Sequence, residues 1–189
     1  MAQILDAATA VFAETGYEAA SANAIAQRAG ISPGSLYQFF SGKQAIAAAL
    51  AERFLAEMRT AHADAFATSG IAELPLARLM DRIIDPIVAF NLANPGLKAL
   101  FVGTDLPGHP GARELLEALA GRVEAIVAIR APSLDATQRA RCATVCLQIV
   151  RSMMALITNA PETERATFVA DLKTILTRYL APIDEAIEG

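Results

Sequence analysis

The sequence predicts an all-α protein with a small N-terminal three-helix domain and a larger C-terminal helical domain. Three observations support this fold class. Every stretch with a clear apolar periodicity repeats at the spacing of a helix, and no stretch alternates apolar and polar residues as a strand does. Apolar residues make up 54% of the 189 residues, and much of this excess is alanine, the best helix former.

The first helix is predicted from a stripe of apolar residues that ends at a glycine. The stripe follows the spacing i, i+1, i+4, i+7, i+8, which places its members on one face of a helix: Ile4, Leu5, Ala8, Val11 and Phe12. Gly16 then ends the helix, because glycine is the residue that most easily adopts the left-handed conformation common after a last helical turn.

Two short helices follow, each with a start signal. Ser21 is a good N-cap for a helix over 22–29, and Gly30 stops it. Ser32 caps the next helix, and Pro33 occupies its first position, where a missing N–H costs nothing. We expect this third helix to be held from behind by apolar residues four apart, Leu36 and Phe40.

The remaining sequence is predicted to be helical too. Breaks at proline- and glycine-containing segments separate the elements, and Pro86 is expected to interrupt one of them. The expected helices span 43–68, 73–93, 97–104, 111–130, 135–158 and 162–185.

Residues 21–40 have the layout of a helix-turn-helix, in which the second helix enters the major groove of DNA. Such a helix needs a small, polar N-terminal end, which Ser32, Pro33, Gly34 and Ser35 supply. Gly34 costs about 1 kcal/mol relative to alanine inside a helix, and a close approach of the backbone to DNA would explain that cost. Tyr37 and Gln38 would project outward, toward phosphate and base edges.

The N-terminal 50 residues resemble the DNA-binding domain of the tetracycline-repressor (TetR) family. Many positions agree in order and spacing, namely Ile4–Ala8, Phe12, Gly16–Tyr17, Ile25–Ser32, Leu36–Phe40 and Lys43. The resemblance implies a homodimer that binds operator DNA and a C-terminal domain with a small-molecule pocket. We therefore expect a helix-turn-helix domain over 1–46 and an effector-binding and dimerisation domain over 47–189, with helix 43–68 connecting the two.

The expected DNA contacts fall into two sets. Base contacts are expected from Pro33, Gly34, Ser35, Tyr37 and Gln38, and phosphate contacts from Ser21, Asn23, Ser32, Tyr37 and Lys43. Other interpretations are available: Ser21 and Asn23 can simply cap a helix, Lys43 can be a solvated surface residue, and Tyr37 can be a core aromatic. Phe39 is compatible with either packing or facing DNA.

The last two helices carry apolar stripes too wide for the surface of a monomer. A two-fold four-helix bundle would bury them, with an interface formed by Val145, Ile149, Phe168, Leu172, Ile175, Leu176 and Tyr179. A mainly apolar effector is expected among Met80, Ile83, Ile87, Phe90, Phe101, Gln148, Arg151 and Met153. Packing within the chain is the alternative for both sets.

Composition excludes several classes of protein. No long stretch lacks both charges and helix breakers, and the N-terminus has no signal-peptide pattern, so we expect a cytoplasmic protein without a membrane segment. Cys142 and Cys146 are expected to pack in the core rather than to sense redox state. We find no spacing typical of a metal, cofactor or catalytic site, so an enzyme is not expected.

The charge argues for a competing interpretation. The net charge is −4, and residues 1–46 hold three acidic and two basic residues. A protein that coats nucleic acid without sequence specificity would be strongly basic. A helical protein-interaction module without DNA binding is therefore the alternative to a specific DNA reader.

Overall fold

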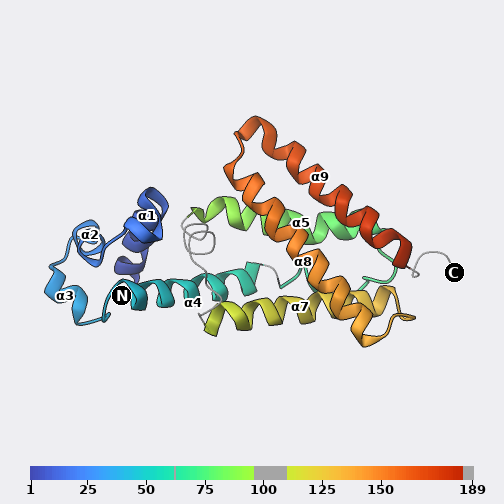
Figure 1. Cartoon of the computed structure of the whole chain (residues 1–189), viewed down its shortest axis with the longest axis horizontal. Helices are drawn as coiled ribbons and strands as arrows, with labels where there is room; N and C mark the ends of the chain where they lie inside the picture. Colours follow the sequence, from blue (N-terminus) through green and yellow to red (C-terminus); the bar gives the residue numbers. More distant parts are fainter. Residues whose placement is uncertain (62, 96–109, 185–189) are drawn as a thin grey trace. The chain divides into compact units, whose positions relative to one another are not determined.

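The computed structural model describes residues 1–61, 63–95 and 110–184 (Figure 1). Within these ranges the chain is helical and contains no strand. The helices are α1 (Ala2–Ala19), α2 (Ala22–Arg28), α3 (Pro33–Tyr37), α4 (Lys43–Ala61), α5 (Leu76–Ala93), α7 (Pro110–Arg130), α8 (Ala136–Asn159) and α9 (Glu162–Leu180). The all-α prediction is confirmed. The helix expected over 97–104 lies outside the described residues.

The structure divides into two compact units. The first contains Met1–Arg59 with the described residues between 93 and 115, and the second contains Thr60–Leu92 with the described residues from Leu116 onward. α4 begins in the first unit and ends at Ala61. The functional boundary at residue 46 stays a prediction.

α1 contains one residue that leaves helical geometry. Gly16 has φ +76° and ψ 163°, and three further residues complete the element to Ala19. The positive φ is the conformation that glycine adopts without steric cost, so the end of the regular helix lies where it was predicted. The inner face of α1 is buried at Ile4, Leu5, Ala7, Ala8, Val11 and Phe12.

α4 is shorter than the sequence predicts. It starts at Lys43 as expected but ends at Ala61, and turns follow over 63–66 and 69–73. The guanidinium of Arg82 on α5 binds three carbonyls of this connecting segment, at 2.9 Å from Asp64, 2.7 Å from Ala67 and 3.3 Å from Ser69. These bonds give carbonyls of the connecting segment a partner on α5, so the turns found where the helix was predicted to continue to 68 are held by side-chain hydrogen bonds.

The described residues of the second unit pack around an apolar core. Its buried members come from α5, α7, α8 and α9 and from the segment before α5, and they include Ile71, Leu79, Ile84, Ile126, Ile157 and Leu172. α5 begins at Leu76 rather than at 73 and continues through Pro86 instead of being interrupted there. The helix tolerates the proline at the expense of one backbone hydrogen bond.

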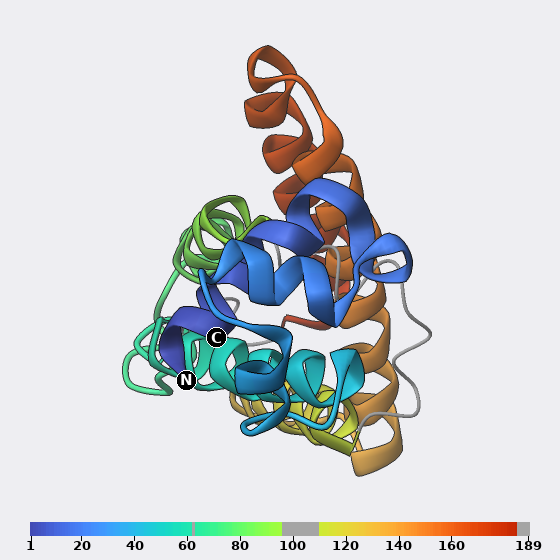
Figure 2. The same cartoon turned by 90° about the vertical axis from the view of Figure 1, so that its left-hand side faces the viewer.

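α8 and α9 form an antiparallel hairpin in the second unit (Figure 2). Asp135 starts α8 with a capping box, because its carboxylate accepts from the Gln138 N–H while the Gln138 side chain accepts from the Asp135 N–H. α9 ends at Leu180, followed by a single 3-10 turn, Ala181–Ile183. The predicted continuation to 185 is therefore wrong over its described part, since Pro182 cannot donate the next helical bond.

α8 is long and apolar enough to cross a membrane when judged by length and composition alone. The core helices of soluble proteins pass the same test, and α8 contributes Cys142, Ala143, Cys146, Met154 and Ile157 to the buried residues of the second unit. Its Arg139 also donates to the Leu134 carbonyl at 2.6 Å. These contacts give α8 a place inside a folded unit.

Candidate functional site

α2 and α3 form a helix-turn-helix whose helices are each capped by a serine. The Ser21 hydroxyl accepts from the Ala24 N–H at 3.1 Å, and the Ser32 hydroxyl accepts from the Ser35 N–H at 3.0 Å. The turn between the helices passes through Gly30, whose φ is +68°. The Ile31 N–H closes it on the Ala26 carbonyl at 3.0 Å. Local sequence signals therefore determine the supersecondary structure.

α3 is anchored on one side and exposed on the other. Leu36 is fully buried and Phe40 is 7% exposed, whereas Tyr37 is 54% exposed and Phe39 53%. The other residues predicted to read bases, Pro33, Gly34 and Gln38, are exposed too, and Ser35 is half-buried. Tyr37 is thus not a core aromatic. The outward face carries the small, polar and aromatic side chains that a groove-entering helix requires.

No described residue of the chain requires glycine at position 34. A Cβ added there would meet the Ser32 Oγ at 3.8 Å, an ordinary van der Waals contact. The position also lacks a positive φ, unlike Gly16, Gly30, Gly42 and Gly70. A glycine kept in a helix without a reason in the fold is consistent with a close approach by another molecule.

Lys43 is held within the chain. Its ammonium donates to the carbonyls of Tyr17 at 2.9 Å and Glu18 at 3.1 Å, and it lies 4.5 Å from the centre of the Tyr17 ring. The carbonyls belong to the end of α1, so Lys43 ties the start of α4 to the end of α1. An ammonium has three donors, and one remains beyond these two bonds. Burial and the charge of Glu18 raise the pKa of Tyr17.

Other cations of the first unit also have partners inside the chain. Arg28 pairs with Glu14 at 2.9 Å, and Arg53 pairs with Asp6 at 2.6 Å while donating to the Thr9 hydroxyl at 3.1 Å. Ser21 and Asn23 are exposed at the start of α2. The predicted phosphate contacts therefore rest mainly on neutral donors.

The residues predicted to line an effector pocket do not share one environment. Met80 is in the core, and Ile83, Ile87 and Met153 pack against the core partly buried. Phe90 is half-buried, and Phe101 lies outside the described residues. Gln148 and Arg151 are exposed on α8, so the single chain does not present them as interior polar groups. Their place on a helix was predictable, but the direction in which they face was not.

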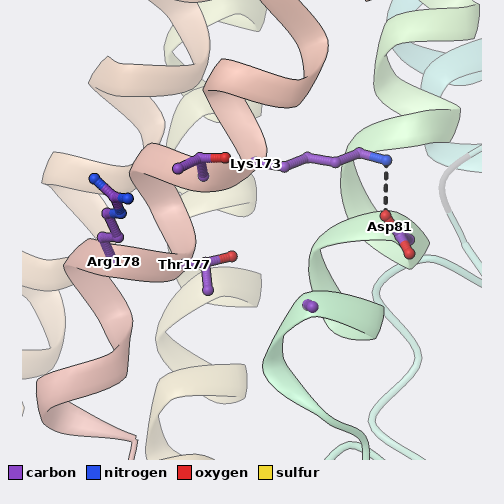
Figure 3. A pocket seen from close by; sticks show the side chains of 6 residues that line it. Asp81, Lys173, Thr177 and Arg178 are labelled. Atoms are coloured by element: carbon purple, nitrogen blue, oxygen red, sulfur yellow. Dashed lines mark hydrogen bonds and ion pairs between the residues drawn. The ribbon is translucent and has the colours of Figure 1, made fainter.

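A hollow of about 290 Å³ lies between α5 and α9, and none of its lining residues was predicted (Figure 3). Lys173 reaches across it and pairs with Asp81 at 2.8 Å and Asp85 at 2.6 Å. Hydrogen bonds and charge from Lys173 lower the pKa of Asp81. The remaining lining residues are Ala77, Thr174, Thr177 and Arg178. The signal that could have revealed this site is the pair of aspartates four apart on one helix.

The predicted dimer residues also separate into two groups. Leu172 and Leu176 are 0% and 3% exposed in the single chain, so they are core residues and we withdraw them from the interface. Ile175 is 43% exposed on α9, and Leu156 on α8, which was not predicted, is 51% exposed. The others are partly buried: Val145, Ile149, Phe168 and Tyr179.

The two cysteines are buried one turn apart on α8. The hydrogen bond between them lowers the pKa of Cys142 to about 7, although burial opposes this shift, and a second hydrogen bond with Tyr179 adds to it. The same Cys142–Cys146 bond, together with burial, raises the pKa of Cys146. Both thiols belong to the core of the second unit, which agrees with a packing role. The described residues contain no cluster suited to a metal ion.

Comparison with known families gives two matches. Residues 4–50 match the family described as bacterial regulatory proteins, tetR family, and residues 75–180 match the tetracyclin repressor-like C-terminal domain. The second match alone covers more than half of the chain. No curated protein matches the sequence.

Solved structures of the same architecture match almost the whole chain. A TetR-like transcriptional regulator from Rhodococcus sp. RHA1 superposes with a TM-score of 0.76 at 20% identity, covering 95% of this chain and 94% of that one. A TetR-family regulator from Streptomyces coelicolor gives 0.70 at 24% identity, covering 96% and 95%. The TetR-family regulator PfmR from Thermus thermophilus gives 0.71 at 19% identity, covering 92% and 96%.

Proposed function

The chain belongs to the TetR family of DNA-binding transcriptional regulators, and on that premise we propose that it is a repressor released by a small molecule. In this proposal a homodimer binds a palindromic operator, and a small, mainly apolar effector ends the binding. The protein acts in the cytoplasm without catalytic activity of its own.

The observation that carries the proposal is the two-sided character of α3. Leu36 and Phe40 hold it to its domain, while Tyr37 and Gln38 face outward beside an unshielded Gly34. A reading helix must be fixed from behind and open in front, since bases are read only by side chains that reach their edges.

We assign the base contacts to Pro33, Gly34, Ser35, Tyr37 and Gln38. Phosphate contacts are assigned to Ser21, Asn23, Ser32, Tyr37 and Lys43. A serine hydroxyl that accepts a capping bond still has its own O–H to donate to a phosphate oxygen. The Ser32 and Ser35 hydroxyls lie 2.9 Å apart, so one of them donates to the other and the second is left to donate outward. The third N–H of Lys43 serves the same purpose.

Dimerisation is proposed through the exposed sides of α8 and α9. Exposed apolar side chains on both helices, Leu156 and Ile175, support this surface. The other residues assigned to it are partly buried on the same two helices: Val145, Ile149, Phe168 and Tyr179. A single short reading helix contacts too few bases for specificity, so two-fold symmetry lets two copies read two half-sites about 34 Å or a multiple apart.

The effector is proposed to bind in the second unit along α5. Ile83, Ile87 and Met153 line the partly buried margin of the core there, and Met80 and Phe90 lie on the same helix α5 as the two isoleucines. α5 lacks one backbone hydrogen bond at Pro86, because proline has no N–H to donate. Arg82 connects this helix to the segment that follows α4. A ligand that shifts α5 would change the equilibrium between two states of α4 by its difference in affinity for them.

Selection of duplexes from random DNA tests the proposal. The purified protein should enrich a palindrome, and sedimentation should show a dimer on the selected duplex. Repeating the selection with a panel of apolar compounds should identify one that reduces binding. Enrichment of no sequence would refute the proposal and favour a protein-interaction module, and a stable monomer at micromolar concentration would refute the dimer.

A further inference from the structure

Phe39 is an exposed aromatic residue beside the reading helix, and the DNA contacts proposed above do not use it. Its side chain is 53% exposed, although the next residue, Phe40, is 7% exposed. Single exposed apolar residues are common on protein surfaces and need no explanation. Phe39 differs because Tyr37, two residues earlier, is exposed to nearly the same degree.

The backbone around Phe39 is fixed. The Phe39 N–H donates to the Leu36 carbonyl at 2.9 Å, and the Phe40 N–H donates to the same carbonyl at 3.0 Å. The turn of α3 therefore continues through residue 40, and the fully buried Leu36 holds it in place. Phe39 is presented by a hydrogen-bonded turn that is anchored to the core of the domain.

Helical spacing places the two aromatic residues on opposite sides of Gln38. Successive residues in a helix differ by about 100° in direction, so Tyr37 and Phe39 point to either side of the residue between them. Leu36 and Phe40 occupy the anchored side. When Gln38 faces the middle of the groove floor, the two rings lie to either side of it, over the base edges that border each wall. Tyr37 brings a hydroxyl to its wall, whereas Phe39 brings only apolar surface.

The charges of residues 1–59 favour an apolar contact at this place. Residues 1–59 hold five acidic and four basic residues, and Arg28, Lys43 and Arg53 are engaged within the chain. Phosphate attraction is therefore limited, which leaves a larger part of the affinity to hydrogen bonds and apolar contacts. The apolar group that bases offer in the major groove is the C5-methyl of thymine.

We propose that Phe39 is a specificity-determining residue that contacts the methyl group of a thymine in each half-site. This inference rests on the proposed function, because it requires that α3 enters the major groove. The methyl contact adds a preference for thymine over cytosine at one position. Hydrogen bonds from Gln38 alone do not give this preference.

The test replaces each thymine of the selected operator, one symmetric pair at a time, with deoxyuridine. This change removes only the methyl group and keeps base pairing intact. The wild-type protein should bind about fourfold more weakly per half-site at one position, the factor that corresponds to burying one methyl-sized group. Phe39→Ala should bind the thymine operator more weakly and show no further loss with deoxyuridine there. Phe39→Leu, which keeps an apolar side chain, should stay sensitive.

Equal sensitivity of the wild type and Phe39→Ala at every position would overturn the inference, as would a wild type that ignores all the replacements. Thermal unfolding of the variants should match the wild type, since the side chain is exposed. Failure of the proposed function gives a different result: the selection from random DNA enriches no operator. That result would also refute the contact proposed for Phe39.

Discussion

The guanidinium of Arg130 makes two hydrogen bonds to the carboxylate of Asp184, from Nε to Oδ1 at 2.7 Å and from Nη2 to Oδ2 at 2.5 Å. The two side chains are 5% and 6% exposed, and Arg130 also donates to the Ile71 and Leu74 carbonyls at 2.7 and 2.6 Å. This arrangement ties the end of α7 and the residues after α9 to the segment that precedes α5. A buried ion pair requires such additional hydrogen bonds to offset the loss of hydration.

Arg130→Met should lower the free energy of unfolding by about 3–5 kcal/mol, because it leaves the Asp184 carboxylate buried without its partner. Urea denaturation followed by circular dichroism measures this loss. Arg28→Met is the control, since its pair with Glu14 is half-exposed and should change stability by less than about 1 kcal/mol. Equal effects of the two substitutions would show that the buried pair contributes no more than a surface one.

Gly34→Ala should separate folding from DNA binding. The added Cβ has room within the chain, so stability should stay the same or rise by up to about 1 kcal/mol. Operator affinity should fall about tenfold, which is about 1.4 kcal/mol of binding free energy, because the methyl group blocks the close approach of the backbone. Gly121→Ala, at an exposed position of α7 with nothing within 4 Å, is the matched control and should leave binding unchanged. Unchanged affinity of Gly34→Ala would remove α3 from the contact surface.

Lys43→Met should have two measurable effects. Thermal stability should fall, because the carbonyls of Tyr17 and Glu18 lose their donor. The slope of log affinity against log salt should become shallower by about 0.9 per protomer, the value for one phosphate contact. Lys173→Met, which removes a cation from the second unit, should leave that slope unchanged. If Lys43→Met lowers stability but leaves the salt slope unaltered, Lys43 only holds α1 to α4 and does not contact phosphate.

Two neighbouring residues of α9 should respond differently to substitution. Ile175→Asp places a charge on an exposed apolar position, so analytical ultracentrifugation should show a shift from dimer to monomer with little change in folding. Leu172→Ala removes a fully buried side chain and should cost about 2–5 kcal/mol of stability. A dimer that survives Ile175→Asp would exclude this side of α9 from the interface.

The link between α5 and α9 should make stability depend on pH at both extremes. Hydrogen bonds and charge from Lys173 lower the pKa of Asp81, so their contribution is present above the usual aspartate range and is lost as pH falls through the lowered value. For Lys173, burial lowers the pKa, but hydrogen bonds and charges from Asp81 and Asp85 outweigh it and the net pKa is raised. That contribution is lost as pH rises through the raised value. Thermal unfolding of Lys173→Met, measured across pH, should show neither the loss of stability at low pH nor the loss at high pH.

The helix-turn-helix of α2 and α3 was predictable because the sequence signals that form it are local. Ser21, Gly30, Ser32 and Pro33 act on the backbone within a few residues, and the spacing of Leu36 and Phe40 decides which side of the third helix is buried. The sequence by itself therefore determined the all-α class, the helix-turn-helix and its exposed face. The length of α4 was overestimated, and the carbonyls of Asp64 and Ala67 in the segment after it accept from Arg82, which lies on another helix and is 15 or more positions away.

Only the tertiary structure decided which side of each helix is buried in the core and which cations have partners. Leu172 and Ile175 belong to one apolar stripe of α9, yet the first is buried and the second exposed, because burial depends on where α5 and α8 pack. Lys43 and Tyr17 are 26 positions apart, and Arg130 and Asp184 are 54 apart. Such pairings form when segments distant in the sequence come into contact, and residue spacing along the chain does not predict that contact.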